Sequence, residues 1–431
     1  MNFLRHEPEA PSALGAATSI GFDAPPLRRA GAADAPVGCV KVLTSAAHIP
    51  VEDWERLAPP DDPLWNQALF LAMEKSSIGP DAYRYLVLFQ QDRLQAVLPV
   101  CIFGGLSLED VLGAQGRRFL RPLRPLASRL LRIRLLLCGH LLGQGRVLRA
   151  PGTTPAAAQL LVDAVQDLAQ QFDSRWIVFK DFAERDVEWL HEALQHRRFF
   201  LAPGLPDAVL QLSTTSFESY IATLSKNGRN EVRSKLKKFS HHDDVRLEVC
   251  DTFSDLVPAM MPLYHAVFER SETRLDVWTP EFFTLVSNDP RIRAKLIACW
   301  KHDQLIGFLL CLLDDESVVV GRIGLDYAAS IPLQLYFILQ YRCIEETMSA
   351  GCRKLYFGQT TYEPKRRMGC HPAPLMHAVT HRNPLIRAAL RQFLPLALNQ
   401  SGQEFEVAAR TLPDTTVAAD ANPSVSRASH H

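Results

Sequence analysis

A dense run of polar side chains follows a short apolar segment in the last quarter of the sequence. The run reads Tyr362-Glu363-Pro364-Lys365-Arg366-Arg367 and lies between two glycines. Its lysine and two arginines can hold a phosphate or a carboxylate, the lysine as a point charge and each arginine as a planar fork. Glu363 and Tyr362 are candidates for a general base and acid, because a carboxylate in a desolvated cleft can have its pKa raised. The alternative is a polar loop in which Glu363 only pairs with Arg366.

A second group of candidates precedes the polar run by about thirty residues. Asp326 and Tyr327 follow an apolar, β-branched segment, where substrate contacts in α/β proteins occur. Asp326 can equally cap the helix that is expected after Ser330. Gln334 and Tyr336 lie near the start of that helix, whose free backbone N–H groups can receive an anion.

A third group lies on a basic segment, residues 225–240, in which Arg229 and Arg233 stand four residues apart beside an apolar stripe. Several cations on one helix can follow a phosphate backbone, but charges beside an apolar stripe are most often the wet face of a packed helix. A role for these two arginines in closing a cleft or binding an anionic acceptor is the preferred interpretation.

The elements that position these candidates form a strand–helix–strand unit. Residues 316–325 are predicted to be a buried strand, residues 332–350 a half-buried helix, and residues 355–357 a second strand. Such units form parallel pairs, and ligands of open α/β sheets bind beyond the carboxyl ends of the strands. The polar run and the start of the helix are therefore expected to meet at one cavity.

The order of elements repeats along the chain. In each half, short helices and a hairpin are followed by a strand, a helix and a strand, so the predicted fold is α/β with a mixed α+β sheet, in two copies side by side. The predicted division is a disordered tail over residues 1–36, a first domain over 37–206, a second domain with the site over 207–400, and a disordered tail over 401–431.

Composition excludes several classes of protein. The 47 basic and 47 acidic residues leave no net charge, so a general nucleic-acid coat, and DNA binding with it, is not expected. The nine cysteines contain no C-x-x-C pair and favour a reducing compartment, so we expect a cytoplasmic protein with no metal site. Two basic, leucine-rich pieces, residues 121–142 and 384–398, leave peripheral membrane contact open, with packing on the parent domain as the default.

Two motifs carry a resemblance to a known family. The segment LSKNGRNEVRSKLKK, residues 224–238, resembles the LSKxxRxxxRxxLRK segment of the FemAB-like, CelD-type branch of the GNAT acyltransferase superfamily. The segment FGQTTYEPKRRMG, residues 357–369, is similar to that branch's FGxxxYExKRRxG loop. The resemblance covers about residues 39–399 and implies two tandem GNAT-like domains. One departure stands out, because the glycine-lined phosphate loop Q/R-x-x-G-x-G/A of simple GNAT enzymes is absent before the helix that follows Ser330.

The resemblance implies an N-acyltransferase without a tightly bound cofactor. It would transfer an acyl or aminoacyl group from acyl-CoA or an acyl-carrier protein to an amine, through a ternary complex, with Lys365→Ala abolishing transfer at an unchanged thermal midpoint. Two alternatives stay open: an aminoacyl-tRNA donor, and a scaffold protein of polysaccharide or natural-product assembly that keeps the fold without chemistry.

Overall fold

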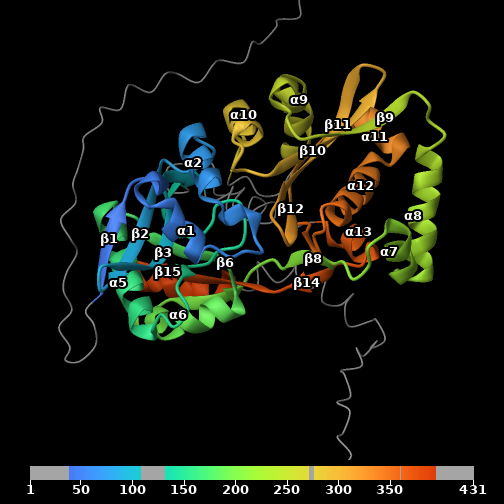
Figure 1. The fold of residues 1–431 in the computed structure, drawn as a ribbon. Helices are drawn as coiled ribbons and strands as arrows, with labels where there is room; N and C mark the ends of the chain where they lie inside the picture. The colour runs from blue at the N-terminus through green and yellow to red at the C-terminus, as the bar shows by residue number, and fades with distance from the viewer. Residues whose placement is uncertain (1–37, 108–131, 271–275, 360, 395–431) are drawn as a thin grey trace, which may run out of the picture.

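The computed structural model describes residues 38–107, 132–270, 276–359 and 361–394. They form two α/β units, each built on one sheet, which lie next to each other (Figure 1). The tails expected at residues 1–36 and 401–431 fall outside the described residues.

The first unit contains an eight-stranded sheet in the order β1-β2-β3-β4-β6-β15-β7, with β5 paired to β3. Its strands are β1 (Cys39–Leu43), β2 (Ala82–Gln90), β3 (Arg93–Ser107), β4 (Arg132–Cys138), β5 (Leu148–Arg149), β6 (Trp176–Ala183), β7 (Phe200–Pro203) and β15 (Leu375–His381). Its helices are α1 (Val51–Leu57), α2 (Gln67–Ser76), α5 (Pro155–Gln171) and α6 (Glu184–His196), with 3-10 turns at Ala46–His48 and Pro63–Trp65. The predicted hairpin corresponds to β2 and β3, which pair antiparallel.

The second unit contains a seven-stranded sheet in the order β14-β8-β13-β12-β11-β10-β9. Its strands are β8 (Asp207–Gln211), β9 (Val245–Cys250), β10 (Ala294–Lys301), β11 (Gln304–Leu313), β12 (Ser317–Leu325), β13 (Lys354–Tyr356) and β14 (His371–Ala373). Its helices are α7 (Phe217–Thr223), α8 (Lys226–Phe239), α9 (Val257–Phe268), α10 (Pro280–Asn288), α11 (Tyr327–Leu333), α12 (Leu335–Ser349) and α13 (Tyr362–Arg367). The expected parallel pair is present as β12 and β13.

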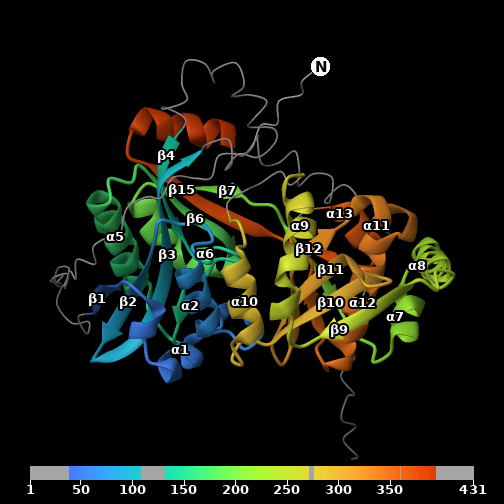
Figure 2. The same ribbon diagram turned by 90° about the horizontal axis from the view of Figure 1, so that it is seen from above.

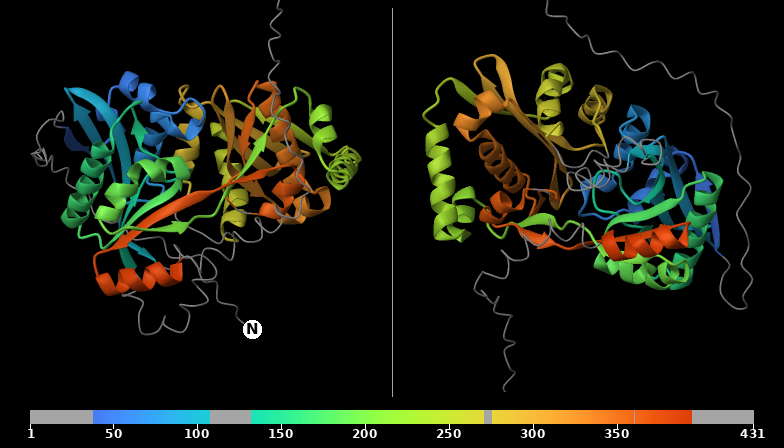
Figure 3. Two further views of the ribbon diagram at one scale, coloured as in Figure 1. Left: turned by 90° about the horizontal axis from the view of Figure 1, so that it is seen from below. Right: turned by 180° about the vertical axis from the view of Figure 1, so that it is seen from behind.

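The two units exchange strands. After β7 the chain leaves the first sheet, and β8 inserts between β13 and β14 of the second sheet. After β14 it returns, and β15 inserts between β6 and β7 (Figures 1 and 3). A division into 37–206 and 207–400 therefore assigns β15 to the second domain although its hydrogen bonds lie in the first sheet.

One hydrophobic core joins the two units. Trp54, Trp65 and Phe70 of the first unit belong to the same buried cluster as Trp278 and Phe282 of the second. A second cluster lies on the other face of the second sheet, under α7, α8 and α12. Burial of large aromatic side chains on both sides of the boundary makes it an internal packing surface, and the two units are held as one body.

One local expectation is wrong. Residues 362–367 are not a loop, because they form the short helix α13. Residues 132–138 of the first basic leucine-rich piece form the largely buried strand β4, in agreement with the default of packing on the parent domain, and residues 121–131 lie outside the described residues. Among the described helices, none is long and apolar enough to cross a bilayer.

Candidate functional site

The polar run lies where the two units exchange strands. β13 ends at Tyr356, and the Phe357 amide donates to the carbonyl oxygen of Ala208 in β8 at 2.9 Å. The Ala208 amide donates in turn to the Gly358 oxygen at 3.2 Å. The chain then turns at Gly358, where φ is +80°, a conformation that glycine adopts at low cost. Strand β8, which follows directly on the first unit, thus fixes the start of the turn into α13.

Lys365 is buried, with 3% of its surface exposed. Its Nζ donates to the carbonyl oxygens of Phe357 at 2.7 Å and Gly358 at 3.0 Å. Burial lowers its pKa to about 8, although the nearby Asp207 carboxylate opposes the change. The ammonium group thus faces main-chain oxygens and holds the turn closed, and the expected contact of Lys365 with a phosphate or carboxylate stays a prediction.

Tyr362 anchors the same turn. Its hydroxyl group donates to the Pro206 oxygen at 2.8 Å, in the segment that leads into β8. Burial raises the pKa of this phenol, so its proton is held more firmly than in water. A role as general acid stays a prediction, and it would need the hydroxyl group to leave the Pro206 oxygen.

Glu363 behaves as the alternative interpretation predicted. Its carboxylate pairs with Arg366 at 3.0 Å and with Arg367 at 2.9 Å. Hydrogen bonds from Arg366 and Arg367 lower the pKa of Glu363, which contradicts the expected rise. Arg367 also reaches Glu231 of α8 at 3.4 Å. The carboxylate and its two arginines form a partly exposed network, and a base with a lowered pKa is a weak proton acceptor.

Asp326 caps a helix. Its side chain accepts from the amides of Ala328 at 2.9 Å and Ala329 at 3.3 Å, so it is the N-cap of α11. Tyr327 is covered by the guanidinium group of Arg270, 3.8 Å from the ring centroid. Of the two interpretations of Asp326 that the sequence left open, a helix cap and a substrate contact, the cap is present. A catalytic role would have to be additional.

Gln334 and Tyr336 lie at the start of α12. Gln334 joins α11 to α12 with φ +55°, and no side chain caps α12. Tyr336 is half-buried, and burial raises its pKa to about 12. The start of this 15-residue helix lacks a side-chain cap and carries a partial positive charge. Two of its amides already have partners, because the Gln334 amide donates to the Ile331 oxygen at 3.1 Å and the Phe337 amide to the Gln334 oxygen at 3.0 Å.

The two arginines of α8 have different surroundings. The Arg229 Nη1 donates to the Leu224 oxygen at 2.5 Å and thereby closes the carboxyl end of α7. Arg233 is exposed on the outer face of α8. Arg229 thus has a structural task, whereas Arg233 is available to solvent.

The strands next to α12 separate. β12 and β13 pair in parallel through three residue pairs, from Ser317–Lys354 to Val319–Tyr356. β12 then continues to Leu325 while the chain after β13 turns away at Gly358. In the first unit the equivalent pair, β4 and β6, is closed further along by the bridge between Gly145 and Phe182, whose ring would collide with any Cβ at Gly145. Only the β12–β13 pair of the second unit therefore has ends that separate without a further bridge among the described residues.

Sequence reasoning missed a buried polar cluster beside this region. Lys180 pairs with Asp181, and the Asp181 amide donates to His377 Nδ1 at 3.2 Å. Gln144 donates to Asp207 at 3.1 Å. Asp181 has φ +56°, a conformation that aspartate tolerates better than most residues. These residues come from β6, β15, β8 and the loop after β4, so no local motif could have united them.

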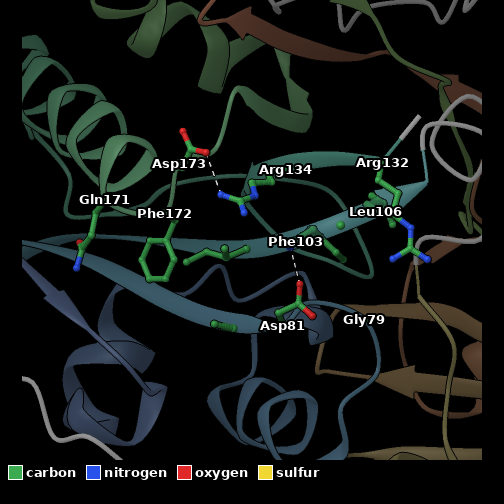
Figure 4. A pocket seen from close by; sticks show the side chains of 13 residues that line it. Gly79, Asp81, Phe103, Leu106, Arg132, Arg134, Gln171, Phe172 and Asp173 are labelled. Atoms are coloured by element: carbon green, nitrogen blue, oxygen red, sulfur yellow. Dashed lines mark hydrogen bonds and ion pairs between the residues drawn. The ribbon is translucent and has the colours of Figure 1, made fainter. Parts of the chain in front are cut away.

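A hollow of about 910 Å³ lies elsewhere, in the first unit (Figure 4). Arg132, Arg134, Phe103 and Asp81 are among the side chains that line it. None of the residues predicted for the site reaches it. Its walls include the ends of β3 and β4, which are joined by residues 108–131, outside the described residues. No group of three or more potential metal ligands is found among the described residues.

One protein family matches part of the second unit. Residues 226–366 match the family described as acetyltransferase (GNAT) domain. Among solved structures, FemX is similar at 10% identity with a TM-score of 0.51, over 81% of this chain and 100% of that one. A tandem GNAT protein from the clavulanic acid biosynthesis pathway is similar at 10% identity with a TM-score of 0.46, over 80% and 99%.

The C-terminal domain of a putative lysylphosphatidylglycerol synthetase from Agrobacterium fabrum is similar at 11% identity with a TM-score of 0.47, over 80% and 97%. No curated protein matches the sequence. At such an identity the likeness to FemX concerns the fold alone, which in this chain consists of two α/β units. The match runs from α8 to α13, so the likeness to the acetyltransferase (GNAT) domain family concerns residues 226–366.

Proposed function

We propose that this protein is an N-acyltransferase that moves an acyl or aminoacyl group from an activated carrier to an amine, with the donor bound at the open end of the β12–β13 pair. The observation that carries the proposal is the divergence of these strands beside the start of α12. An acyl thioester or ester lying between separated strands can extend their hydrogen bonding, and the uncapped helix start favours the anionic part of the donor.

The donor is proposed to be acyl-CoA or an acyl-carrier protein. Both carry phosphate at the far end of the pantetheine arm that bears the thioester, and this phosphate matches the partial positive charge at the start of α12. Gln334 and Tyr336 are the proposed donor contacts, because they flank that helix start. Arg366 and Arg367 are proposed only as secondary contacts, since Glu363 already holds them.

The acceptor amine and the compartment are also part of the proposal. Arg233 is the proposed contact for an anionic acceptor, because it is exposed on α8. All nine cysteines are free thiols in the structure, which supports a reducing compartment such as the cytoplasm. An aminoacyl-tRNA donor would use the same helix start, but it would bind with a steep salt dependence.

The test is a charge change at the helix start. Gln334→Glu should weaken acyl-CoA binding, measured by calorimetric titration, because it places a negative charge beside the donor phosphates; Gln334→Lys should preserve or strengthen it. One charge near a helix end contributes about 0.3–1 kcal/mol, so shifts of about two- to fivefold in Kd are expected. The thermal midpoint of each variant controls for stability, because Gln334 ends α11 as well as beginning α12.

The outcomes separate the alternatives. Intact-mass detection of an acylated amine with acyl-CoA or acyl-carrier protein supports the proposal. Transfer that needs charged tRNA and falls steeply with salt supports the tRNA donor instead. If no donor binds and the two Gln334 variants behave alike, the donor site is not at α12.

A further inference from the structure

The helix that follows β15 has an apolar face directed to solvent. Residues 384–394 are helical, and Asn383 begins the helix by accepting from the Leu385 amide at 2.8 Å. Leu385 is 79%, Phe393 65% and Ile386 41% exposed. Seven large hydrophobic side chains are exposed among the described residues, and this one helix carries three of them.

The inner face of the same helix is already satisfied. Leu390 and Leu394 pack against Phe200, Ala202 and Val379 of β7 and β15. The helix therefore lies on the outer side of the first unit, where the views from above and below show it beside the sheet (Figures 2 and 3). Leu385, Ala389 and Phe393 recur at four-residue intervals, so they lie along one side, away from the packed leucines.

Arginines flank the exposed apolar side. Residues 382–394 contain Arg382, Arg387 and Arg391 and no acidic residue, although the whole chain has no net charge. Arg391 is exposed, and no ion pair of Arg391 is found within the described part of the chain. Arg382 reaches Asp173 at 3.4 Å, and Arg134 reaches the same carboxylate at 2.9 Å. The positive surface thus continues from the helix onto β4.

We propose that helix 384–394 docks the protein on the surface of an anionic bilayer, with Leu385 and Phe393 inserted between headgroups and the arginines against lipid phosphates. A helix with apolar and cationic residues on its free side is suited to lie in the plane of the interface. A second copy of the chain fits less well, because pairing two such faces would bring like charges together.

The full-length protein should co-sediment with vesicles of phosphatidylcholine and phosphatidylglycerol and stay in the supernatant with phosphatidylcholine alone. Binding should fall as salt rises, because exposed charges are screened. Protein that remains in the supernatant with phosphatidylglycerol vesicles, or that binds both vesicle types equally, would overturn the proposal.

Variants locate the contact. The double variant Leu385→Ser with Phe393→Ser should lower the partition coefficient by about tenfold or more, because both insertions are lost. Arg391→Glu should lower it by about fivefold or more, at roughly 1 kcal/mol for each charge near the surface. Matched controls are Ile331→Ser, 64% exposed on α11, and Lys238→Glu on α8, and both should bind as the original protein does.

The thermal midpoint of each variant, measured by circular dichroism, shows whether the substitution has destabilised the fold. If the double variant is destabilised, the vesicle binding of Arg391→Glu tests the proposal by itself. This substitution is not expected to unfold the protein, because the Arg391 side chain is exposed. Binding by Arg391→Glu equal to the original, or an equal loss in the controls, would refute docking through this helix.

Discussion

Removing the ammonium group of Lys365 has two opposing effects on stability. In Lys365→Met, which keeps the length of the stem, the oxygens of Phe357 and Gly358 lose a charged donor. Hydrogen bonds to charged groups contribute about 1.5–3 kcal/mol each. The Gly358 oxygen keeps the Ala208 amide, so the loss is largest at Phe357. Against this, the variant no longer buries a charge.

The cost of that charge follows from its pKa. Lys365 has a pKa of about 8 in the folded protein against 10.5 in a model peptide. The difference of about 2.5 units corresponds to about 3 kcal/mol. At pH 7, Lys365→Met should therefore destabilise the protein by about 0–3 kcal/mol. The thermal midpoint is then not expected to stay unchanged, as sequence alone had suggested for Lys365→Ala.

The dependence on pH gives the sharper test. Because the folded pKa lies below the unfolded one, between pH 8 and 10.5 the unfolded chain binds more protons at this site, so stability rises with pH over this window. Below pH 8 the full cost of the buried charge is present. Relative to Lys365→Met, the original protein should gain about 3 kcal/mol across the window.

The assay is urea unfolding of both proteins at several pH values from about 7 to about 10.5. Lys354→Met is the matched control, because burial lowers the pKa of Lys354 but the hydrogen bonds and charge interactions with Asp61 and Tyr356 together raise it above its usual value. Stability from Lys354 is complete below its unfolded pKa of 10.5 and is lost only as pH rises through the higher folded one, so the difference between the original and the control should stay flat over this range. A difference between the original and Lys365→Met that is flat or falls with pH would refute the buried-charge argument.

Two other substitutions separate structural from chemical roles at the candidate site. Glu363→Gln should lower the free energy of unfolding in urea by less than about 1 kcal/mol, since the ion pairs of Glu363 are partly exposed. The variant should keep transfer activity. An inactive but fully stable variant would restore Glu363 as the general base. Asp326→Ala should lower the free energy of unfolding by about 0.5–2 kcal/mol, because the N-cap of α11 is lost. Asp326→Asn should retain the cap and the stability. Loss of activity in the asparagine variant at unchanged stability would assign Asp326 a catalytic role beyond the cap.

Local pattern determined most elements of this protein. The strand expected at residues 316–325 is β12, and the helix expected at residues 332–350 corresponds largely to α12. Apolar periodicity and turn residues act over a few positions, so they can be read without knowledge of distant partners. The order of these elements was sufficient to predict a tandem architecture.

Tertiary structure decided the exchange of strands and the environment of the candidate residues. β15 pairs with β6, about two hundred residues earlier, and no short-range signal encodes that pairing. Lys365 lies in a segment whose sequence is typical of an exposed basic loop, but its side chain is buried. The reason is that the chain from Pro206 to Ala208 packs against the turn between β13 and α13. The sequence by itself determined which segments form helices and strands, because those preferences are local; only the folded chain decided which cations face solvent, because burial depends on segments far away in the sequence.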